Sequence, residues 1–299
     1  MKILLIGNFL GPTWDGSISD EEHIAEALEE LGHQVIRKQR GHPGWPPGNY
    51  DFTLVAQWDQ YGLSLDNVPK PLVYWAFDYQ ADGQEWHEIL VKQSDLYLSK
   101  RIADSKYPNW QWLSQDFAPK FLDKWKEPIS VEMYEQAPLD RDIDVLFTGS
   151  YLPWATERNE TLKAVDDKFN LTIHSVNEWP GFKNQLGPLM DMELPRLYSR
   201  AKVILSIDHT LEAGYWSDRN AQIMACGRRP LFRYVPLSES TFHNNVDYFY
   251  NVQDCLEQIQ YILDGLRPAV LEDVSYNAAG ELKVIQRVAD LLTIVKGIL

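Results

Sequence analysis

The sequence predicts an α/β protein made of two Rossmann-like halves. Near the start, the apolar run from Lys2 to Ile6 precedes a glycine-containing loop, an amphipathic helix over 19–31 and a second strand from Gln34. The same layout returns at Ile143, where the strand IDVLFTGS precedes a loop, a helix near 157–169 and the strand LTIHSV. Short apolar strands that alternate with helices are typical of parallel sheets covered on both faces. The repeated layout therefore predicts two similar domains.

The first half supplies the strands of one parallel sheet. The helix over 19–31 places apolar residues on one stripe and acids on the other, and Gly32 ends it. Further strands are predicted at 52–56, 72–77 and 95–99, with a helix near 84–93. His23, in the first helix, is expected to be a partly buried surface histidine.

Candidate ligand-contacting residues of this half follow its strands. The loop after the first strand has no GxGxxG pattern, so it is no dinucleotide fingerprint. Gly11, Gly16 and Ser17 are expected to let a ligand approach the backbone closely. Ligands of parallel sheets bind at the carboxyl ends of the strands, where Trp58 and Asp78 fall. We expect Trp58 to shape a pocket for a ligand of this half, with a rigid surface loop as the alternative.

Hydrophobic periodicity is lost between Pro119 and Asp142, which predicts a connection between the halves. The expected division is an N-terminal domain over 1–118, a connection over 119–141 and a C-terminal domain over 142–299. The second domain continues with a strand at 202–207, a strand at 248–250 and a helix near 253–263. The last helix, near 280–296, is placed to pack back on the N-terminal domain.

The stretch WSDRNAQIMACGRRPLFRYV, from Trp216 to Val235, predicts the binding site. It reads as a short helix, a glycine stop, two arginines and a buried strand. Ser217 or Asp218 is expected to cap the helix. Arg219 and Gln222 rise from one helix face near its start, where free N–H groups favour an anion. We predict a phosphate and ribose site here; the competing interpretation is a solvated helix face and a basic turn. Three further arginines belong to this stretch, at positions 228, 229 and 233.

Composition excludes several classes of protein. The net charge of −15 argues against a generally basic, nucleic-acid-coating surface. Only two cysteines occur, at Cys226 and Cys255, without CxxC spacing, which fits a reducing compartment. No apolar stretch approaches the roughly 20 residues that span a bilayer, and the apolar start is too short for a signal peptide. We expect a cytoplasmic protein without a membrane span.

Metal and hydrolase signatures are missing from the sequence. HExxH, GxSxG and Walker loops do not occur. Asp140, Asp142 and Asp144 alternate in a DxDxD string, which is a possible metal site, but they also alternate into a predicted strand. We therefore expect no metal site.

A larger pattern in the second half carries a family resemblance. A strand ends in Gly149-Ser150, and Arg158 lies early in the next helix. The strand VILSI is followed by Ser217, Arg219 and a helix over 221–227. A strand, a Phe242-type helix and the run YFYNVQDCLEQIQYILDG complete the pattern. With these features the chain resembles the group 1 glycosyl transferases of GT-B architecture, closest to the spore-maturation glycosyltransferase-like group. The resemblance covers 142–299, and 1–110 only in layout.

The resemblance implies two Rossmann-like domains that face each other across a cleft. A nucleotide-sugar donor, expected to be a UDP-sugar, would lie mainly on the second domain and the acceptor mainly on the first. Gly149, Ser150 and Arg158 would line the diphosphate, with Ser217 and His209 also near the donor. Arg219 would neutralise the departing phosphate. The glutamate that binds the donor ribose in the family falls on Gln222 here.

The resemblance also implies a chemistry without metal or cofactor. Arginine suits phosphate geometry because it can bind in a bidentate manner. Arg158 and Arg219 are the first candidates for this role, and Arg228 and Arg229 the second. Asp78 is the candidate base for the acceptor proton, with a strand-end turn or helix cap as the alternative.

Several alternatives remain at this stage. His209 is either a hydrogen-bond partner of the donor or a plain loop residue, and Trp179 either stacks on a base or, more in line with its type, packs in the core. The family's retaining glutamate falls on Gly214, with Glu212 nearby, so that motif is not intact.

The predicted function is a hexosyl- or pentosyltransferase that uses a nucleotide sugar. A non-catalytic nucleotide- or sugar-binding module of the same fold, or a sugar-nucleotide epimerase, is the alternative. The acceptor is a small molecule, a glycan, a protein or a modified nucleic-acid base, and the sequence does not choose among them.

Overall fold

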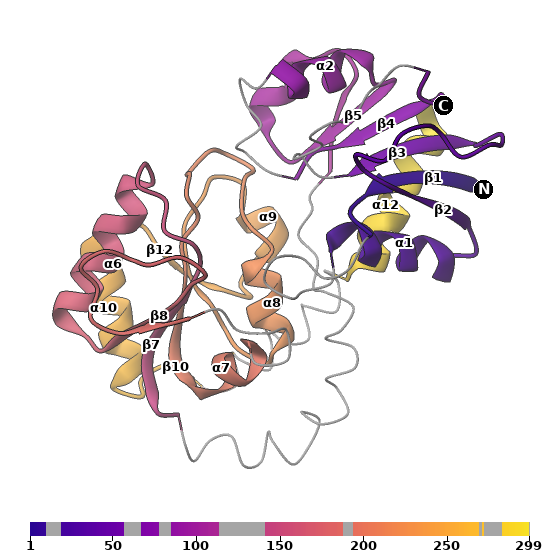
Figure 1. Ribbon diagram of the computed structural model, residues 1–299. Helices are drawn as coiled ribbons and strands as arrows, with labels where there is room; N and C mark the ends of the chain where they lie inside the picture. The colour runs from indigo at the N-terminus through magenta and orange to yellow at the C-terminus, as the bar shows by residue number, and fades with distance from the viewer. Residues whose placement is uncertain are drawn as a thin grey trace. The chain divides into compact units, whose positions relative to one another are not determined.

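The computed structural model describes residues 1–9, 19–56, 67–77, 85–113, 141–187, 194–268, 271 and 283–298. The chain divides into two compact units, of which one comprises Met1–Gln115 with Lys283–Leu299 and the other Asp116–Leu282 (Figure 1). The expected connection at 119–141 lies almost entirely outside the described residues.

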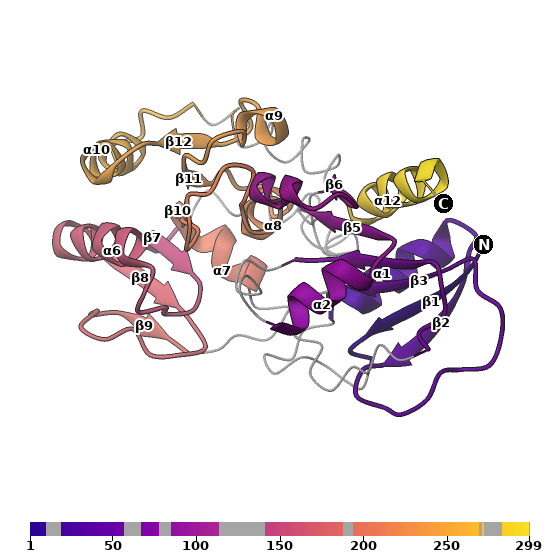
Figure 2. The same cartoon turned by 90° about the horizontal axis from the view of Figure 1, so that it is seen from above.

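The first unit is built on a parallel six-stranded sheet with the order β2-β1-β3-β4-β5-β6. The last helix, α12 (Val284–Ile298), returns to this unit and packs against α1 (Asp20–Glu30) (Figures 1 and 2). Its elements are β1 (Lys2–Gly7), α1, β2 (Gln34–Gln39), β3 (Phe52–Ala56), β4 (Leu72–Trp75), α2 (Glu85–Gln93), β5 (Leu96–Ser99), η2 (Ile102–Lys106), β6 (Trp110–Trp112) and α12.

Local chemistry explains why the elements of the first unit form where they do. The hydroxyl of Ser19 accepts a hydrogen bond from the backbone N–H of Glu22, which starts α1. Gly32 ends the turn after α1 with φ of +83°, a backbone conformation that costs glycine little. His23 is 3% exposed, so the expectation of a partly buried surface histidine was wrong. It lies beside Ile24 on the buried side of α1.

The second unit is also built on a parallel six-stranded sheet, with the order β12-β11-β10-β7-β8-β9. Both sheets therefore have the Rossmann-like form that the sequence predicts. Its elements are β7 (Ile143–Thr148), α6 (Thr156–Lys168), β8 (Leu171–His174), β9 (Gln185–Leu186), α7 (Leu194–Arg200), β10 (Ala201–Ser206), α8 (Arg219–Ala225), β11 (Leu231–Arg233), α9 (Glu239–Phe242), β12 (Asp247–Phe249) and α10 (Val252–Leu263).

Alternation along the central strands divides the core of the second unit into two layers. Val145 and Phe147 of β7 pack in one apolar cluster with residues of α6 and α10. Leu146 packs in the other cluster, with residues of α7, α8 and α9. Because successive side chains of a strand point to opposite faces, one strand supplies both layers. Phe147, the aromatic ring of the site described below, thus stands on a strand that is buried on both sides.

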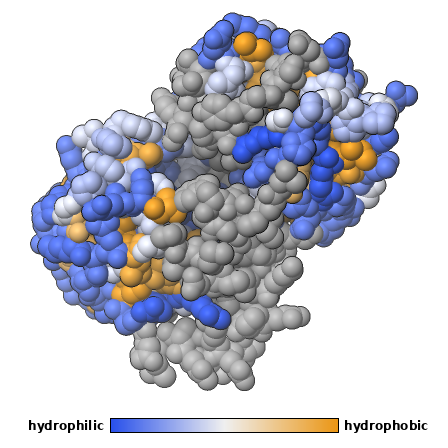
Figure 3. Space-filling view, in the orientation of Figure 1, coloured by the Kyte–Doolittle hydropathy of each residue, from blue (hydrophilic) through white to orange (hydrophobic). Residues whose placement is uncertain are grey.

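On the face drawn in Figure 3, most of the coloured residues of each unit are hydrophilic, and hydrophobic residues appear between them. Within the described ranges, no helix combines the length and the apolar character that crossing a membrane requires.

Candidate functional site

The carboxyl end of β7 is the point where the second sheet changes its direction of winding. After β7 the chain passes through α6 to β8 on one side, whereas β10 pairs with β7 on the other side. Open parallel sheets bind ligands outside the carboxyl ends of the strands at such a switch point. Gly149 and Ser150 follow β7 directly, and Asp208 and His209 follow β10.

Two arginines from different helices lie against one aromatic ring at this point. Arg158 belongs to the first turn of α6, and its Cζ lies 5.9 Å from the centroid of the Phe147 ring. Arg219 begins α8, and its Cζ lies 5.3 Å from the same centroid. The structure therefore brings together the two residues that the sequence singled out for a diphosphate. The sequence pattern did not identify Phe147 as the ring that holds them.

Gly149 brings the backbone close to both groups. A Cβ at this position would lie 3.1 Å from Nη2 of Arg219 and 3.1 Å from Cζ of Phe147, and the residue has φ of +154°. Its N–H donates to the carbonyl of His174 at 3.0 Å, and its carbonyl accepts from Nε1 of Trp179 at 2.9 Å. The loop is fixed on both sides, and a side chain here would be strained by this φ and would press on both the ring and the guanidinium.

Trp179 belongs to the core, as the sequence indicated, and it also supports the site. It is fully buried and lies edge-on to Phe147, with ring centroids 5.6 Å apart. The Cζ of Arg158 lies 5.5 Å from its ring. A cation over the face of an aromatic ring is attracted by the ring quadrupole. Arg158 is thus held between two rings rather than by a carboxylate.

The charges at the site are unbalanced toward the positive side. Arg158 is 4% exposed, and Nη2 donates to the carbonyl of Ser150 at 2.8 Å. Its Nε has no hydrogen-bond partner. Burial, followed by the nearby charge of Arg219, lowers the pKa of Arg158 to about 10, while Asp208 and Tyr215 act in the opposite direction. At neutral pH both arginines are charged, and a bound anion relieves their mutual repulsion.

Asp208 is a functional candidate that sequence reasoning missed. Its carboxylate is buried, lies 3.5 Å from Nη1 of Arg219 and accepts the backbone N–H of Ser217 at 3.2 Å. It therefore fixes both the cation and the turn that leads into α8. The available indication was an acidic residue directly after the buried strand VILSI.

The start of α8 differs from the capped helix that the sequence predicts. Asp218 stands at the N-cap position with helical dihedral angles and makes no capping hydrogen bond. Its carboxylate accepts from Nε2 of Gln222 at 2.6 Å instead. The hydroxyl of Ser217 has no hydrogen-bond partner. The prediction of a cap by either residue was wrong, because Asp208 holds the turn from the side of β10.

Three aromatic side chains on two loops of the site lie against one another. The rings of Trp154 and His209 are 5.1 Å apart and nearly perpendicular, and those of His209 and Tyr215 are 5.0 Å apart. Trp154 lies on the loop between β7 and α6, and the other two lie on the loop between β10 and α8. The structure thus places His209 between two aromatic rings, next in sequence to Asp208, which pairs with Arg219.

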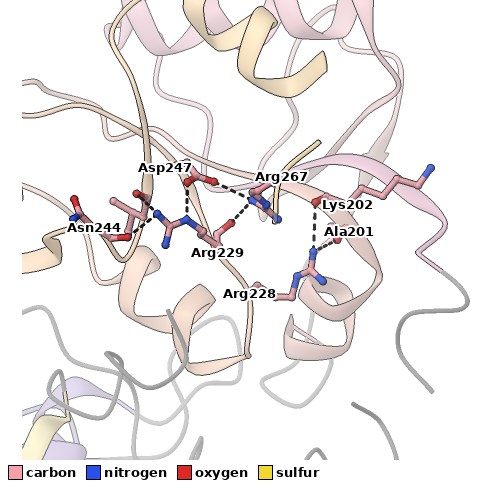
Figure 4. Close-up of polar contacts among 8 residues, drawn as sticks. Ala201, Lys202, Arg228, Arg229, Asn244, Asp247 and Arg267 are labelled. Carbon is pink, nitrogen blue, oxygen red and sulfur yellow. Dashed lines mark hydrogen bonds and ion pairs between the residues drawn. The ribbon is translucent and has the colours of Figure 1, made fainter. Parts of the chain in front are cut away.

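Arg228 and Arg229, the second candidates for the anion, are buried for another reason. Nη2 of Arg228 donates to the carbonyl of Ala201 at 2.6 Å (Figure 4). Nε of Arg229 donates to Asp247 at 2.6 Å, and its Nη2 donates to the carbonyls of Asn244 and Val246. These contacts bind β10 and β12 to the turn after α8. The interpretation of the pair as phosphate ligands was therefore wrong.

Arg233 and the aspartate string also bind protein groups. Arg233 pairs with Glu157 at 2.7 Å. Asp142 and Asp144 pair with Arg200 and Lys202, each at 2.5 Å. Within the described ranges, no group of three or more histidines, cysteines or acids is placed to hold a metal ion.

The candidates of the first unit fall outside the described residues. These candidates are Gly11, Gly16, Ser17, Trp58 and Asp78. Asp140 of the second unit, the first residue of the aspartate string, also lies outside the described residues. Next to the predicted glycine loop, the hydroxyl of Ser19 donates to the carbonyl of Asn8, and the buried Glu21 accepts the N–H of Asn8.

Comparisons with known proteins give a match to one family and to solved structures of the same fold. Residues 157–292 match the family described as glycosyl transferase-like. No curated protein sequence matches the chain.

Solved structures of glycosyltransferases share the fold over the whole chain. Sucrose-phosphate synthase from Thermosynechococcus elongatus has a TM-score of 0.65 at 12% identity, over 99% of this chain and 98% of its own. An alpha-glucosyltransferase, solved in complex with UDP and a 13-mer DNA containing a central A:G mismatch, has a TM-score of 0.66 at 12% identity, over 99% of both chains. The DNA-modifying enzyme beta-glucosyltransferase, solved with and without uridine diphosphoglucose, has a TM-score of 0.63 at 15% identity, over 99% of this chain and 100% of its own. These likenesses establish the GT-B fold.

Proposed function

We propose that this chain, a GT-B glycosyltransferase whose residues 157–292 belong to the glycosyl transferase-like family, moves a sugar from a UDP-sugar to an acceptor hydroxyl without a metal ion. The structures that share its fold include enzymes solved with UDP or uridine diphosphoglucose, which supports UDP as the nucleotide. The acceptor belongs to one of the four classes that the sequence leaves open.

The observation that carries the proposal is the pair of guanidinium groups on Phe147. Arg158 and Arg219 lie against this ring from two helices, beside a glycine whose missing side chain lets the ring and the Arg219 guanidinium come close to the backbone. A diphosphate carries charge over oxygen atoms that match the N–H donors of arginine. The pair supplies two positive charges where other transferases use a metal ion.

The chemistry follows from where charge develops. As the bond between the sugar and the diphosphate breaks, the leaving oxygen gains negative charge, and fixed donors lower the energy of this state. We assign this role to Arg219 and Arg158. Gly149 and Ser150 line the phosphates, and Ser217, His209 and Gln222 contact the rest of the donor. Asp78 accepts the proton of the acceptor hydroxyl.

A thermal-shift experiment with a matched control tests the proposal. Saturation with UDP at about 100 times Kd is expected to stabilise the fold by about 2.7 kcal/mol, which raises Tm by about 5–10 °C. Arg219→Ala should abolish the shift, because it removes one of the two diphosphate ligands. Arg200→Ala, which truncates an exposed arginine of the same unit, should leave it unchanged.

Turnover is tested separately. Incubation with UDP-glucose, alone and with representatives of the four acceptor classes, should release UDP, and chelation of divalent ions should not slow the release. A missing shift across UDP, GDP, ADP and TDP sugars would overturn the proposal. Binding without release of UDP, even by slow hydrolysis, would identify a non-catalytic module instead.

A further inference from the structure

Trp154 is the most exposed member of the aromatic group that it forms with His209 and Tyr215. It has 52% of its surface exposed, whereas Tyr215 has 2% and Arg158 has 4%. Large apolar rings contribute stability when they are buried, so half-exposure of a tryptophan leaves much of its surface without protein contacts. The ring therefore lies at the rim of the site, and the charged groups lie deeper.

The loop that carries Trp154 is held firmly. The N–H of Ala155 donates to the carbonyl of Leu152 at 3.0 Å, and Nδ2 of Asn159 donates to the same carbonyl at 2.9 Å. The N–H of Tyr151 donates to Oδ1 of Asn177 at 2.7 Å, and Nδ2 of Asn177 returns a bond to the carbonyl of Tyr151. The tryptophan thus projects from a loop whose backbone is fixed before any ligand binds, which lowers the entropic cost of using it as a contact surface.

Ring contacts connect Trp154 to the charged part of the site. His209 lies 5.1 Å from Trp154, with the ring planes at 83°, and 5.0 Å from Tyr215. Tyr215 is close enough to Arg158 to raise the pKa of its guanidinium. His209 directly follows Asp208, which pairs with Arg219. A ligand whose diphosphate binds Arg158 and Arg219 can therefore extend along His209 and Tyr215 toward the Trp154 ring.

On this basis, and resting on the proposed function, we propose that Trp154 is the stacking platform for the transferred sugar ring of the donor. A pyranose presents a face of C–H groups that packs on an indole, and its hydroxyl groups require hydrogen-bond partners such as the imidazole of His209. The transferred group must be reachable by an acceptor, so the surface that contacts it belongs at the exposed rim. The nucleoside has no such requirement.

Affinity measurements on two ligands separate this role from the alternatives. Calorimetric titrations with UDP-glucose and with UDP are carried out on the full chain and on Trp154→Ala. Loss of the platform should weaken UDP-glucose on the order of fivefold, in line with the value of one aromatic contact, and leave UDP within twofold. Trp154→Phe, which keeps a ring, should recover most of the affinity. Tyr250→Ala removes a comparably exposed ring of the same unit and should change neither ligand.

Three other outcomes of these titrations would overturn the assignment of Trp154 to the sugar. Equal weakening of UDP and UDP-glucose by Trp154→Ala would overturn the sugar assignment and place the ring under the uracil. Unchanged affinity for both ligands would overturn any contact of this residue with the donor. If the unaltered protein binds neither ligand, the proposed function itself fails and the platform fails with it. Saturation-transfer NMR adds a second readout, since the sugar protons of UDP-glucose should lose saturation in Trp154→Ala while the uracil protons keep it.

Discussion

Two arginine pairs in the same unit have opposite surroundings. Arg228 and Arg229 are adjacent in sequence, and their guanidinium groups donate to backbone carbonyls and to Asp247 (Figure 4). Arg158 and Arg219 come from different helices and lie on the ring of Phe147, and Asp208 pairs with Arg219 at 3.5 Å.

The difference lies in what satisfies each charge. Nη2 of Arg228, and Nε and Nη2 of Arg229, donate to carbonyls and a carboxylate at 2.6–2.8 Å, so these two side chains bind protein acceptors. Arg158 and Arg219 lie against ring faces, and the N–H groups that they do not use toward Ser150, Ile207 and Asp208 lie in the guanidinium plane, where an anion can accept them. Burial alone therefore does not identify a binding arginine, since members of both pairs are buried. The substitutions below test this difference between the two arginine pairs, in order of decreasing expected effect.

The largest expected effect is on folding, at Arg229. Arg229→Ala should lower the free energy of unfolding by about 3 kcal/mol, because it leaves the carboxylate of Asp247 and two carbonyls without a main donor. Urea unfolding followed by circular dichroism measures this loss. The folded fraction of the variant should still bind UDP with the original Kd. A large change in Kd with normal stability would place Arg229 in the ligand site.

A smaller loss of stability, together with a gain in affinity for UDP, is expected at Asp208. Asp208→Asn keeps an oxygen that can accept the N–H of Ser217 but removes the negative charge near Arg219. A phosphate then no longer competes with a carboxylate, so the affinity for UDP should rise severalfold while the ligand-free fold loses about 1 kcal/mol. Calorimetry measures the first effect and urea unfolding the second. Asp144→Asn, at an exposed ion pair, is the control. Weaker binding in Asp208→Asn would show that its charge is needed to orient Arg219.

The smallest effect is a pH dependence that comes from Arg158. Burial and the charge of Arg219 lower its pKa from the ordinary value of arginine to about 10. Affinity for UDP should be constant between about pH 7.5 and 9, where both arginines are charged, and fall as the pH rises through about 10. A group whose pKa is lower in the folded state holds fewer protons there than in the unfolded chain, so this titration stabilises the ligand-free fold as the pH rises. Titrations of Arg158→Ala, which lacks the group, should lose the step near pH 10; a step of the same size there would assign it elsewhere.

The sequence predicted the two-sheet α/β fold and most of its longer strands and helices, whereas short elements such as β6, β9 and α7 were not predicted. Buried strands such as 52–56 and 143–148 form as their apolar runs predict, and Arg158 and Arg219 follow strands at the edge where parallel sheets bind ligands. Local pattern is sufficient here because strand and helix preferences depend on neighbouring residues. The roles assigned to the residues of the first unit stay predictions, because those residues lie outside the described ranges.

The tertiary structure alone separates the arginines that donate to protein acceptors from those that lie on an aromatic ring. The carbonyl that binds Arg228 belongs to Ala201, 27 residues earlier in the chain, and no local pattern brings the two together. The same holds for Phe147, Trp179 and Asp208, which contact Arg158 or Arg219 and come from separate strands and loops. An arginine's function depends on which acceptors surround it, and those acceptors are set by the packing of distant segments rather than by the residues beside it in sequence.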